Sequence, residues 1–425
     1  MIAHRDPQAT AASLPNPVDQ AAYLDMLGDF ARLGDVFGTV LSAQLTLPLL
    51  GRQALRVVRR ERRSGTELLA RDVVSSGSAF LERRFDGPEV DKLWSPWLLH
   101  TGLGPENATG GLMIPVFAAT LHAVGMPIVK GGAANFIRAF ERLLHDSGVD
   151  VYTGQLVEKI IVRGGTATGV LAGGEHIAAS RAVLASVTPT ALYQDLLPPE
   201  AVPPVVASQT RSYRYGRAAM QVHVALSTPA AWTDERLAQT PLIHITDGGR
   251  QTAISCAQAA AGQLPVSPTI VVGQQHILDP SRVPDGAGSL WIQLQEVPYQ
   301  PVGDAAGELD VSEGWTESLK RQYVDRVLRI LERHAPGLQS QIVGIDILSP
   351  ADLEHANPNA RFGDPYGGSG ELDQNLVFRP FPSAAQHATA VRKLWHIGSS
   401  THPGPGLGGG SGYLVSTSLS RRRRW

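Results

Sequence analysis

The feature that most constrains this 425-residue chain is its C-terminal sequence RKLWHIGSSTHPGPGLGGGSGYLVSTSLS. A short apolar stretch leads there into a glycine-rich segment and then into an apolar helical pattern. A strand, a glycine turn and a helix in this order place backbone N–H groups and a helix N-terminus at one point, which favours a phosphate or another anion. Glycine is needed where a ligand approaches the backbone closely. The pattern predicts an anion site or, with equal weight, a flexible glycine turn before a terminal helix.

Within this segment Gly404, Gly406 and Gly409 form a G-x-G-x-x-G sequence, the spacing of a dinucleotide-binding loop. In a Rossmann unit that loop opens a βαβ of ~30 residues, and an acidic residue follows ~20 positions later. Only 16 residues follow Gly409, and they end in four arginines and a tryptophan. The loop therefore does not match the start of such a unit, and a nucleotide bound here needs further contacts elsewhere.

Composition and charge exclude several classes of protein. The chain has 37 Lys and Arg against 39 Asp and Glu, a formal net charge of −2, which provides no general attraction for nucleic acid. Cys256 is the only cysteine, so an intrachain disulfide and a thiolate metal cage are excluded. The N-terminus lacks the apolar stretch of a signal peptide, and no run of ~18 apolar residues occurs. We expect a cytoplasmic protein that contacts a membrane at most peripherally.

The first third of the chain predicts helices. Residues 18–63 predict two helical stretches, because apolar residues recur at three- and four-residue spacing. The second ends in RVVRRERR, which fits a helix at a membrane surface or an acidic partner, or a solvated helix face, the commoner case. Residues 66–125 also predict helices, with breaks at Gly87-Pro88 and around 102–111.

The pattern then changes to an α/β type. A helix is expected at about Asn135–His145, followed by short strands separated by glycine turns: VDVYTG, VEKIIVRGG, ATGVLAG, EHIAA and AVLAS. The proline-rich residues 196–207 predict a crossing between domains. Beyond them we expect the helix SEGWTESLKRQYVDRVLRILERHAPG and strands at Ala218–Leu226, Leu242–Ile245, Thr269–Ile277 and Ser289–Glu296.

Several of these stretches resemble one family. KGGAANFIRAFERLLHDSGVDVYTGQLVEKIIVRGGTATGVLAGGEHIAASRAVLASVTP is similar to the middle segment of phytoene-dehydrogenase-like FAD-dependent oxidoreductases, in the amine oxidase and carotenoid desaturase superfamily. GSSTHPGPGLGGGSGYLV resembles their C-terminal flavin motif. DPYGGSGELDQNLVFRPFP and GQQHILDPSRVPDGAGSLWIQLQEVP resemble stretches of their substrate domain. The resemblance runs through most of residues 60–420.

The resemblance implies an α/β fold with a glutathione-reductase-like FAD/NAD(P)-binding domain and a substrate domain of mixed sheet and helices. It assigns residues 126–195 and 391–425 to the FAD-binding domain, and residues 1–125 and 196–390 to the substrate domain. FAD is the implied cofactor. The glycine segment would be its second contact, with backbone contacts from Gly398, Gly406, Gly408 and Gly409. Val157 would meet the adenine through its backbone, or is simply a residue of a core strand.

One departure from the family pattern stands out. Such enzymes begin with a strand, a G-x-G-x-x-G loop, a helix and an acidic residue for the ribose, and residues 1–130 contain no such sequence. Gly28, Gly34 and Gly38 are too far apart, and no apolar strand precedes them. We therefore expect that the FAD-binding domain is incomplete at its N-terminus, and that flavin binding by this chain alone is impaired.

The remaining polar residues admit two interpretations each. His402 is a general base or a ring that shapes the turn over the flavin, and the second role is favoured because hydride transfer to flavin needs no strong base. Asp373, Gln374 and Arg379 line the substrate side of the flavin or form a salt-bridged turn. His122, His223, His244 and His276 show no metal spacing and are expected to be structural. No catalytic residue and no metal site is predicted.

The implied activity is hydride transfer from a small, apolar or amine-like organic substrate to FAD, followed by electron transfer to oxygen, a quinone or another acceptor. The alternative is a non-catalytic remnant or interaction protein that keeps the substrate domain and binds no flavin by itself. A shared fold does not fix a shared chemistry, so the sequence names neither the substrate nor the acceptor.

Overall fold

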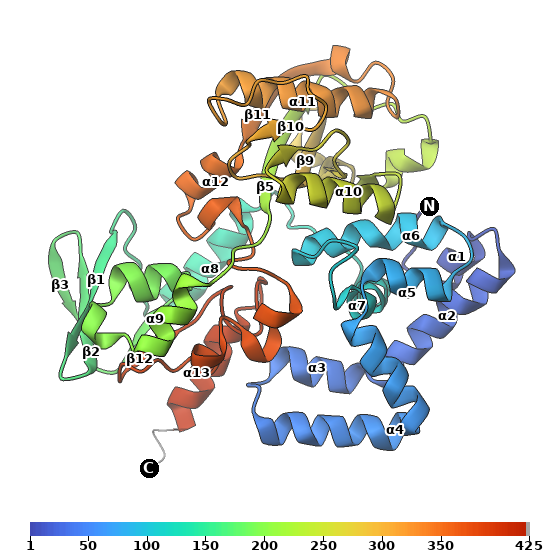
Figure 1. Ribbon diagram of the computed structural model, residues 1–425. Helices are drawn as coiled ribbons and strands as arrows, with labels where there is room; N and C mark the ends of the chain where they lie inside the picture. The colour runs from blue at the N-terminus through green and yellow to red at the C-terminus, as the bar shows by residue number, and fades with distance from the viewer. Residues whose placement is uncertain (422–425) are drawn as a thin grey trace. The chain divides into compact units, whose positions relative to one another are not determined.

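The computed structural model describes residues 1–421, which form two compact units, each built from three separate segments of the chain (Figure 1). The first unit comprises residues 1–28, 72–151 and 217–358, and the second comprises 29–71, 152–216 and the residues from 359 onward. These divisions differ from the boundaries predicted after residues 125, 195 and 390. The assignment of segments to an FAD-binding and a substrate domain stays a prediction.

The first unit contains a five-stranded antiparallel sheet in the order β11-β5-β9-β8-β6. Its strands are β5 (Ala218–Leu226), β6 (Leu242–Ile245), β8 (Ile270–Gly273), β9 (Gly288–Val297) and β11 (Ile342–Leu348). The bounds of β5 and β6 are those predicted. The strand predicted at Thr269–Ile277 is shorter, because the chain turns after Gly273 into a 3₁₀ helix at Gln275–Ile277.

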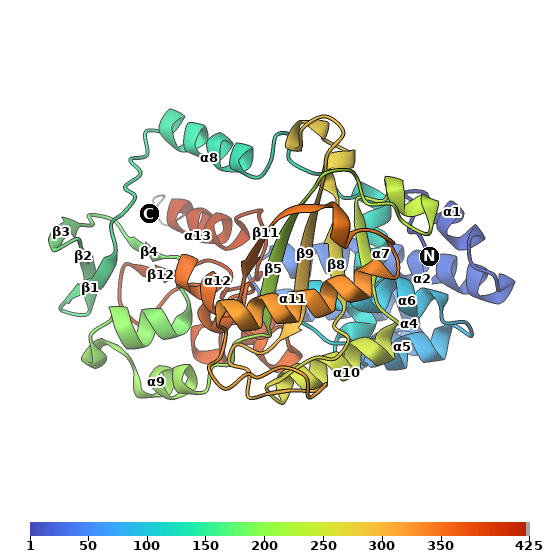
Figure 2. The same ribbon diagram turned by 90° about the horizontal axis from the view of Figure 1, so that it is seen from above.

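The helix α11 (Glu317–Glu332) covers one face of this sheet (Figure 2). It begins at Thr316, whose side chain accepts a hydrogen bond from Leu319 N, a typical N-cap. Its apolar stripe, including Val324 and Val327, is fully buried against alternate residues of the strands, such as Val222 and Ile292. The predicted helix is confirmed, and the alternation along β5 is what a sheet with one covered face requires.

A second core of the first unit is helical. Its buried side chains include Tyr23, Met26, Phe80 and Trp94. The helices are α1 (Pro7–Ala12), the first part of α2 (Pro17–Arg32), α5 (Gly77–Arg84), α6 (Glu89–Trp94), a 3₁₀ helix at Ser95–Thr101, and α7 (Gly110–Val124). The predicted breaks at 87–88 and 102–111 separate these helices. Smaller elements are α10 (Gly249–Ala260), α12 (Pro350–Ala356) and the parallel pair of β7 (Gln263–Leu264) with β10 (Gly303–Asp304).

The helix α8 (Ala134–Asp146) confirms the predicted amphipathic helix, yet none of its residues is buried. The segment 149–154, predicted as a strand, forms none. A strand obtains its backbone hydrogen bonds from a neighbouring strand, and none of the described strands pairs with this segment. Its side chains are accordingly exposed, Tyr152 by 75%.

The second unit contains an antiparallel meander of β1 (Val157–Arg163), β2 (Thr166–Ala172) and β3 (Glu175–Ala178). The turns between these strands are the pairs Gly164-Gly165 and Gly173-Gly174, all with positive φ, as two-residue hairpins require. The next strand, β4 (Val183–Ala185), pairs in parallel with β12 (Leu394–His396). The four strands predicted here are confirmed.

The helices of the second unit correct two predictions. The stretch 18–63 forms three helices instead of two: α2, α3 (Gly34–Ser42) and the kinked α4 (Leu47–Val74). Residues 196–207 do not cross between units, because proline at N1 starts the helix α9 (Pro204–Arg211) within this unit. The RVVRRERR segment lies on α4, where Arg60 pairs with Asp35 at 2.9 Å, and is largely exposed. The last helix is α13 (Gly410–Arg421).

None of the helices among residues 1–421 combines the length and the hydropathy needed to cross a bilayer.

Candidate functional site

The candidate site lies at the carboxyl ends of β4 and β12, where ligands bind in open α/β sheets. Small residues follow both strands: Ser186 comes directly after β4, and Gly398 lies two residues after the end of β12. A Cβ on Gly398 would lie 3.0 Å from Ser186 Oγ, and the residue has a φ of 98°. Glycine is therefore required where the two chain segments leave the sheet. Gly398 N donates a hydrogen bond of 2.8 Å to Ser411 Oγ, which ties the end of β12 to α13.

The turn after Gly398 is closed by its own backbone. Thr401 N and its hydroxyl both donate to Gly398 O, at 3.1 and 2.9 Å, and Gly404 N donates to Thr401 O at 2.7 Å. His402 is 2% exposed within this turn. Its Nε2 lies 3.0 Å from Ala43 O, to which it donates, and its main-chain oxygen accepts from His387 Nε2 at 2.8 Å.

Burial, the largest cause, lowers the pKa of His402 to about 4, so its ring is neutral near pH 7. With Nε2 donating to Ala43 O, the proton-free Nδ1 is buried and has no partner among the described residues. A base with so low a pKa is poorly matched to proton abstraction near neutral pH. The geometry favours the role of His402 in shaping the turn.

The loop from Gly404 to Gly409 is open. A Cβ on Gly406, Gly408 or Gly409 would meet no atom within 4 Å, and Leu407 is 79% exposed. No backbone acceptor within residues 1–421 is recorded for the N–H groups of residues 406–409. The helix α13 starts directly after them, so its unpaired first N–H groups add to the same cluster of donors. Backbone donors, a helix N-terminus and the absence of side chains fit the diphosphate of a dinucleotide such as FAD.

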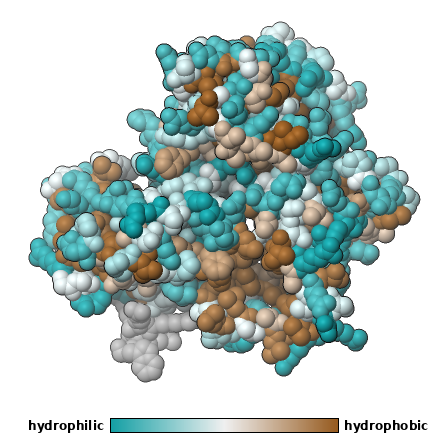
Figure 3. All heavy atoms as spheres, viewed as in Figure 1, coloured by the Kyte–Doolittle hydropathy of each residue, from teal (hydrophilic) through white to brown (hydrophobic). Residues whose placement is uncertain are grey.

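Apolar side chains lie uncovered on the same unit. In Figure 3 hydrophobic residues gather in the lower middle of the face shown, over α3 and the coil beside it. Leu41 and Leu47, on either side of the α3–α4 connection, are 43% and 85% exposed, and Tyr413 of α13 is 69% exposed. The connection carries Ala43, the residue that accepts from His402. An apolar surface of this kind suits the flat ring system of a flavin as well as additional protein.

Arg379 holds the base of the glycine turn. Its guanidinium is 1% exposed and donates from Nε to Ser399 O at 2.9 Å, from Nη1 to Ser369 O at 3.2 Å and from Nη2 to Tyr366 O at 2.8 Å. Burial lowers the pKa of this group. These bonds all go to backbone carbonyls, so Arg379 holds two loops together.

Asp373 and Gln374, which were predicted to act together with Arg379, also stabilise a turn. Gln374 is buried and accepts from Arg214 N at 3.0 Å, and the exposed Asp373 pairs with Arg214 Nη2 at 2.7 Å. Sequence reasoning missed Asp364, a buried carboxyl that accepts from the N–H groups of Gly216, Tyr366 and Gly368 at 2.7–2.8 Å. An aspartate before Pro-Tyr-Gly-Gly is the available signal for such a turn.

Val157 lies apart from this cluster. It begins β1, pairs with Ala172 in the meander and is 39% exposed. The structure brings together Gly398, His402, Gly406, Gly408 and Gly409, because they share one continuous turn. Contact of any of these residues with FAD stays a prediction.

Comparison with known proteins identifies the family. The model of the family described as "Flavin containing amine oxidoreductase" matches residues 12–346. This chain belongs to that family. Membership confirms the resemblance stated above and the flavin cofactor, since the family is flavin-containing.

The curated relatives include the rat "Pyridine nucleotide-disulfide oxidoreductase domain-containing protein 2", which is 29% identical over 299 residues, 67% of this chain and 49% of the relative. The "zeta-carotene-forming phytoene desaturase" of Myxococcus xanthus is 27% identical over 284 residues, 67% of this chain and 50% of the relative. The chain thus spans about half the length of the curated relatives it matches.

Two solved structures share the fold. An oxidoreductase from Methanosarcina mazei has a TM-score of 0.56 at 15% identity, covering 88% of this chain and 73% of that one. Putrescine oxidase bound to putrescine has a TM-score of 0.55 at 15% identity, covering 97% of this chain and 77% of that one. The predicted α/β FAD-binding fold is confirmed by these neighbours. Its predicted incompleteness at the N-terminus stays a prediction.

Proposed function

We propose that this chain is the flavin-closing part of an FAD-dependent oxidoreductase that removes a hydride from a small organic substrate. The observation that carries the proposal is the open loop 404–409, in which the N–H groups of residues 406–409, directly before α13, have no backbone acceptor within residues 1–421. When bound, FAD supplies the acceptor for the hydride that leaves a C–H bond of the substrate. Gly406, Gly408 and Gly409 would bind the cofactor by backbone, and His402 and Arg379 would hold the turn in the shape that fits it.

We propose an apolar or an amine-like substrate. Similar proteins include a phytoene desaturase and a putrescine oxidase bound to putrescine. An apolar substrate would be taken up from a lipid bilayer. The exposed basic residues 56–63 of α4 are the candidate contact with that bilayer. Sedimentation with anionic and neutral vesicles tests this contact, and equal, low binding to both would refute it.

We further propose that a βαβ unit outside the described residues completes the flavin site. Parallel sheets are normally covered on both faces, whereas β4 and β12 form a pair of only two strands among the described residues. Segment 149–154 remains unpaired, and no Rossmann fingerprint occurs in residues 1–130. Such a unit supplies the pyrophosphate cradle and the ribose carboxylate in dinucleotide-binding folds.

The test measures flavin content and affinity after expression with excess FAD. We expect strongly substoichiometric flavin in the chain alone, and binding restored when an N-terminal FAD-binding unit is added in cis or as a separate polypeptide. In the restored form, Gly406→Val should weaken FAD binding by at least about tenfold, ~1.4 kcal/mol, because a branched side chain enters the space of the ligand. Gly51→Val, on the exposed face of α4 where a Cβ also meets no atom within 4 Å, is the matched control.

Each possible outcome tests a different part of the proposal. One flavin per chain without an added unit would show that the site needs no completion. Equal affinity in Gly406→Val and the parent would show that the loop is only a connector. Absence of flavin with every added unit would favour the alternative of a non-catalytic interaction protein.

A further inference from the structure

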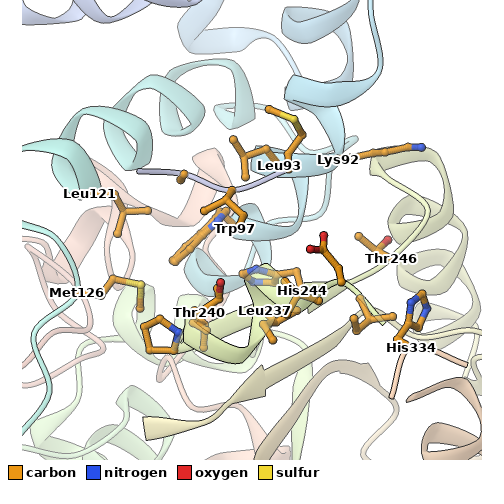
Figure 4. A pocket seen from close by; sticks show the side chains of 18 of the residues that line it. Lys92, Leu93, Trp97, Leu121, Met126, Leu237, Thr240, His244, Thr246 and His334 are labelled. Carbon is orange, nitrogen blue, oxygen red and sulfur yellow. The ribbon is translucent and has the colours of Figure 1, made fainter. Parts of the chain in front are cut away.

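A pocket of about 500 Å³ lies within the first unit, and all the residues that line it belong to that unit. Its walls come from α6 and the 3₁₀ helix after it, the edge strand β6, the end of α11 and residues 1–5. In Figure 4 Trp97 and His244 lie at the middle of the pocket, with Leu121 and Met126 on one side and His334 on the other. The volume falls within the range of small-molecule sites, ~300–1,000 Å³.

The floor of the pocket is aromatic. The ring centroid of Trp97 lies 5.0 Å from that of His244, 5.1 Å from that of His100 and 5.8 Å from that of Phe117. These contacts hold the indole in a fixed orientation. Trp97 also lines the pocket, and a fixed indole in this position packs well against a second flat ring.

A pair of histidines sets the polarity of this floor. His100 Nε2 and His244 Nε2 lie 2.9 Å apart, so one of the two nitrogens donates and the other accepts. Burial lowers the pKa of His100 to about 4 and that of His244 well below its usual value, and His100 adds to the shift of His244. Both rings are therefore neutral near pH 7. His244 Nδ1 has no partner among residues 1–421, and it donates or accepts according to the tautomer of the pair.

Charged side chains of both signs line the pocket: Arg5, Lys92, Asp247 and Arg333 are exposed, and Asp234 is half-buried and pairs with Arg236. These charges give no clear preference for an anion or a cation. On the floor, a charged ligand would lose its hydration and find no charged partner in Trp97, His100 or His244. This loss is costly, since an unpaired buried charge is strongly unfavourable.

We propose that this pocket binds a neutral, planar aromatic molecule, which packs on the Trp97 indole and shares one hydrogen bond with His244 Nδ1. The site is separate from the proposed flavin site in its residues, and its test needs no flavin. Because Nδ1 adapts through the His100–His244 pair, both a hydroxyl donor and a ring-nitrogen acceptor fit the same position. The ligand is thus selected by shape and neutrality.

Calorimetric titration of the full chain with small probes tests the neutrality. Phenol and indole should bind at one site, and benzoate and benzylammonium should bind at least about tenfold more weakly, because they bring a charge to the floor. Nuclear magnetic resonance of the histidine rings should show that phenol shifts the signals of His244 and His100. Absence of saturable phenol binding at millimolar concentration, or equal affinity for the charged probes, would overturn the proposal.

Two variants locate the site. Met126→Trp fills the pocket from a lining residue that is 43% exposed, and it should abolish binding of phenol. Leu278→Trp, at a residue of the same unit that is 52% exposed and does not line the pocket, should bind as the parent does. His244→Phe should weaken phenol binding while leaving toluene binding unchanged, since only phenol uses the ring nitrogen. Unchanged phenol binding in both Met126→Trp and His244→Phe would refute the assignment.

Discussion

Glu296, near the end of β9, makes the stability of the first unit depend on pH. Its side chain is fully buried, and burial outweighs the opposing effects of Thr269 and Arg217, so its pKa rises from 4.5 to about 8. Between these values the unfolded chain has released the proton while the folded chain retains it. The folded state then binds more protons, and the free energy of unfolding falls as pH rises.

The size of this effect follows from the two pKa values. Each pH unit between them costs ~1.4 kcal/mol, and the curve flattens near each end. From pH 5 to pH 7 the contribution of Glu296 lowers the free energy of unfolding by ~2.5 kcal/mol. The contribution is fully present below pH 4.5 and is lost by about pH 8. Glu296→Gln removes the proton equilibrium while keeping the shape of the side chain.

The assay is urea unfolding of the parent and Glu296→Gln at pH 5, 6, 7 and 8, followed by tryptophan fluorescence. This signal reports mainly on the first unit, which contains five of the seven tryptophans: Trp94, Trp97, Trp232, Trp291 and Trp315. The free energy of the variant minus that of the parent should increase by ~2.5 kcal/mol between pH 5 and pH 7, because all other titrations cancel in the difference. The matched control is Glu313→Gln, at an exposed residue of the same unit. Parallel pH curves for parent and Glu296→Gln would refute the reasoning.

Three further predictions concern the glycine turn. Arg379→Met leaves buried carbonyls without their donor and should destabilise the second unit by ~3 kcal/mol or more, seen as a lower urea midpoint and faster proteolysis of the loop. Gly398→Ala forces a side chain to within 3.0 Å of Ser186 Oγ at a φ of 98°, and should lower the melting temperature more than Gly51→Ala does. His402→Asn should alter flavin affinity or absorption in the restored protein while changing the rate of flavin reduction by less than the ~10²–10⁴-fold typical of a lost general base, with the pH profile unchanged. A larger loss of rate with full flavin occupancy would establish His402 as the base.

Local sequence patterns were sufficient to predict two strands of the sheet and the glycine loop. The strands β5 and β6 have the predicted bounds because alternating side chains mark a sheet with one covered face. The glycine loop was predicted from an α/β pattern, because an apolar strand precedes it and a helix follows it. In contrast, the segment 149–154 has the composition of a strand but no partner among the described strands, and composition does not reveal a missing neighbour.

The hydrogen bonds that hold the candidate site in shape could not be predicted from the sequence, for a different reason. Arg379 donates to the backbone carbonyls of Tyr366, Ser369 and Ser399. Every residue of any sequence has such a carbonyl. The partner of an arginine that pairs with carboxylates can be anticipated from acidic residues in the sequence. An arginine that binds backbone carbonyls has no such signal. His402 shows the same limitation, since its partner Ala43 lies 359 residues away and contributes only a carbonyl oxygen.

During synthesis of the chain, β4 cannot pair until β12 has been made. Val183 of β4 pairs with Leu394 of β12, so more than 200 residues must be synthesised after β4 before its partner exists. At ~5–20 residues per second, a ribosome needs roughly 10–40 s for this stretch. During that interval the edge of β4 and the apolar residues around it are exposed to solvent or to chaperones. Because each compact unit is assembled from three separated segments, and the first unit extends to Pro358, no nascent fragment that ends before residue 358 holds a whole unit. We therefore expect yield from heterologous expression to depend on temperature and on chaperone supply more steeply than for a chain with contiguous domains.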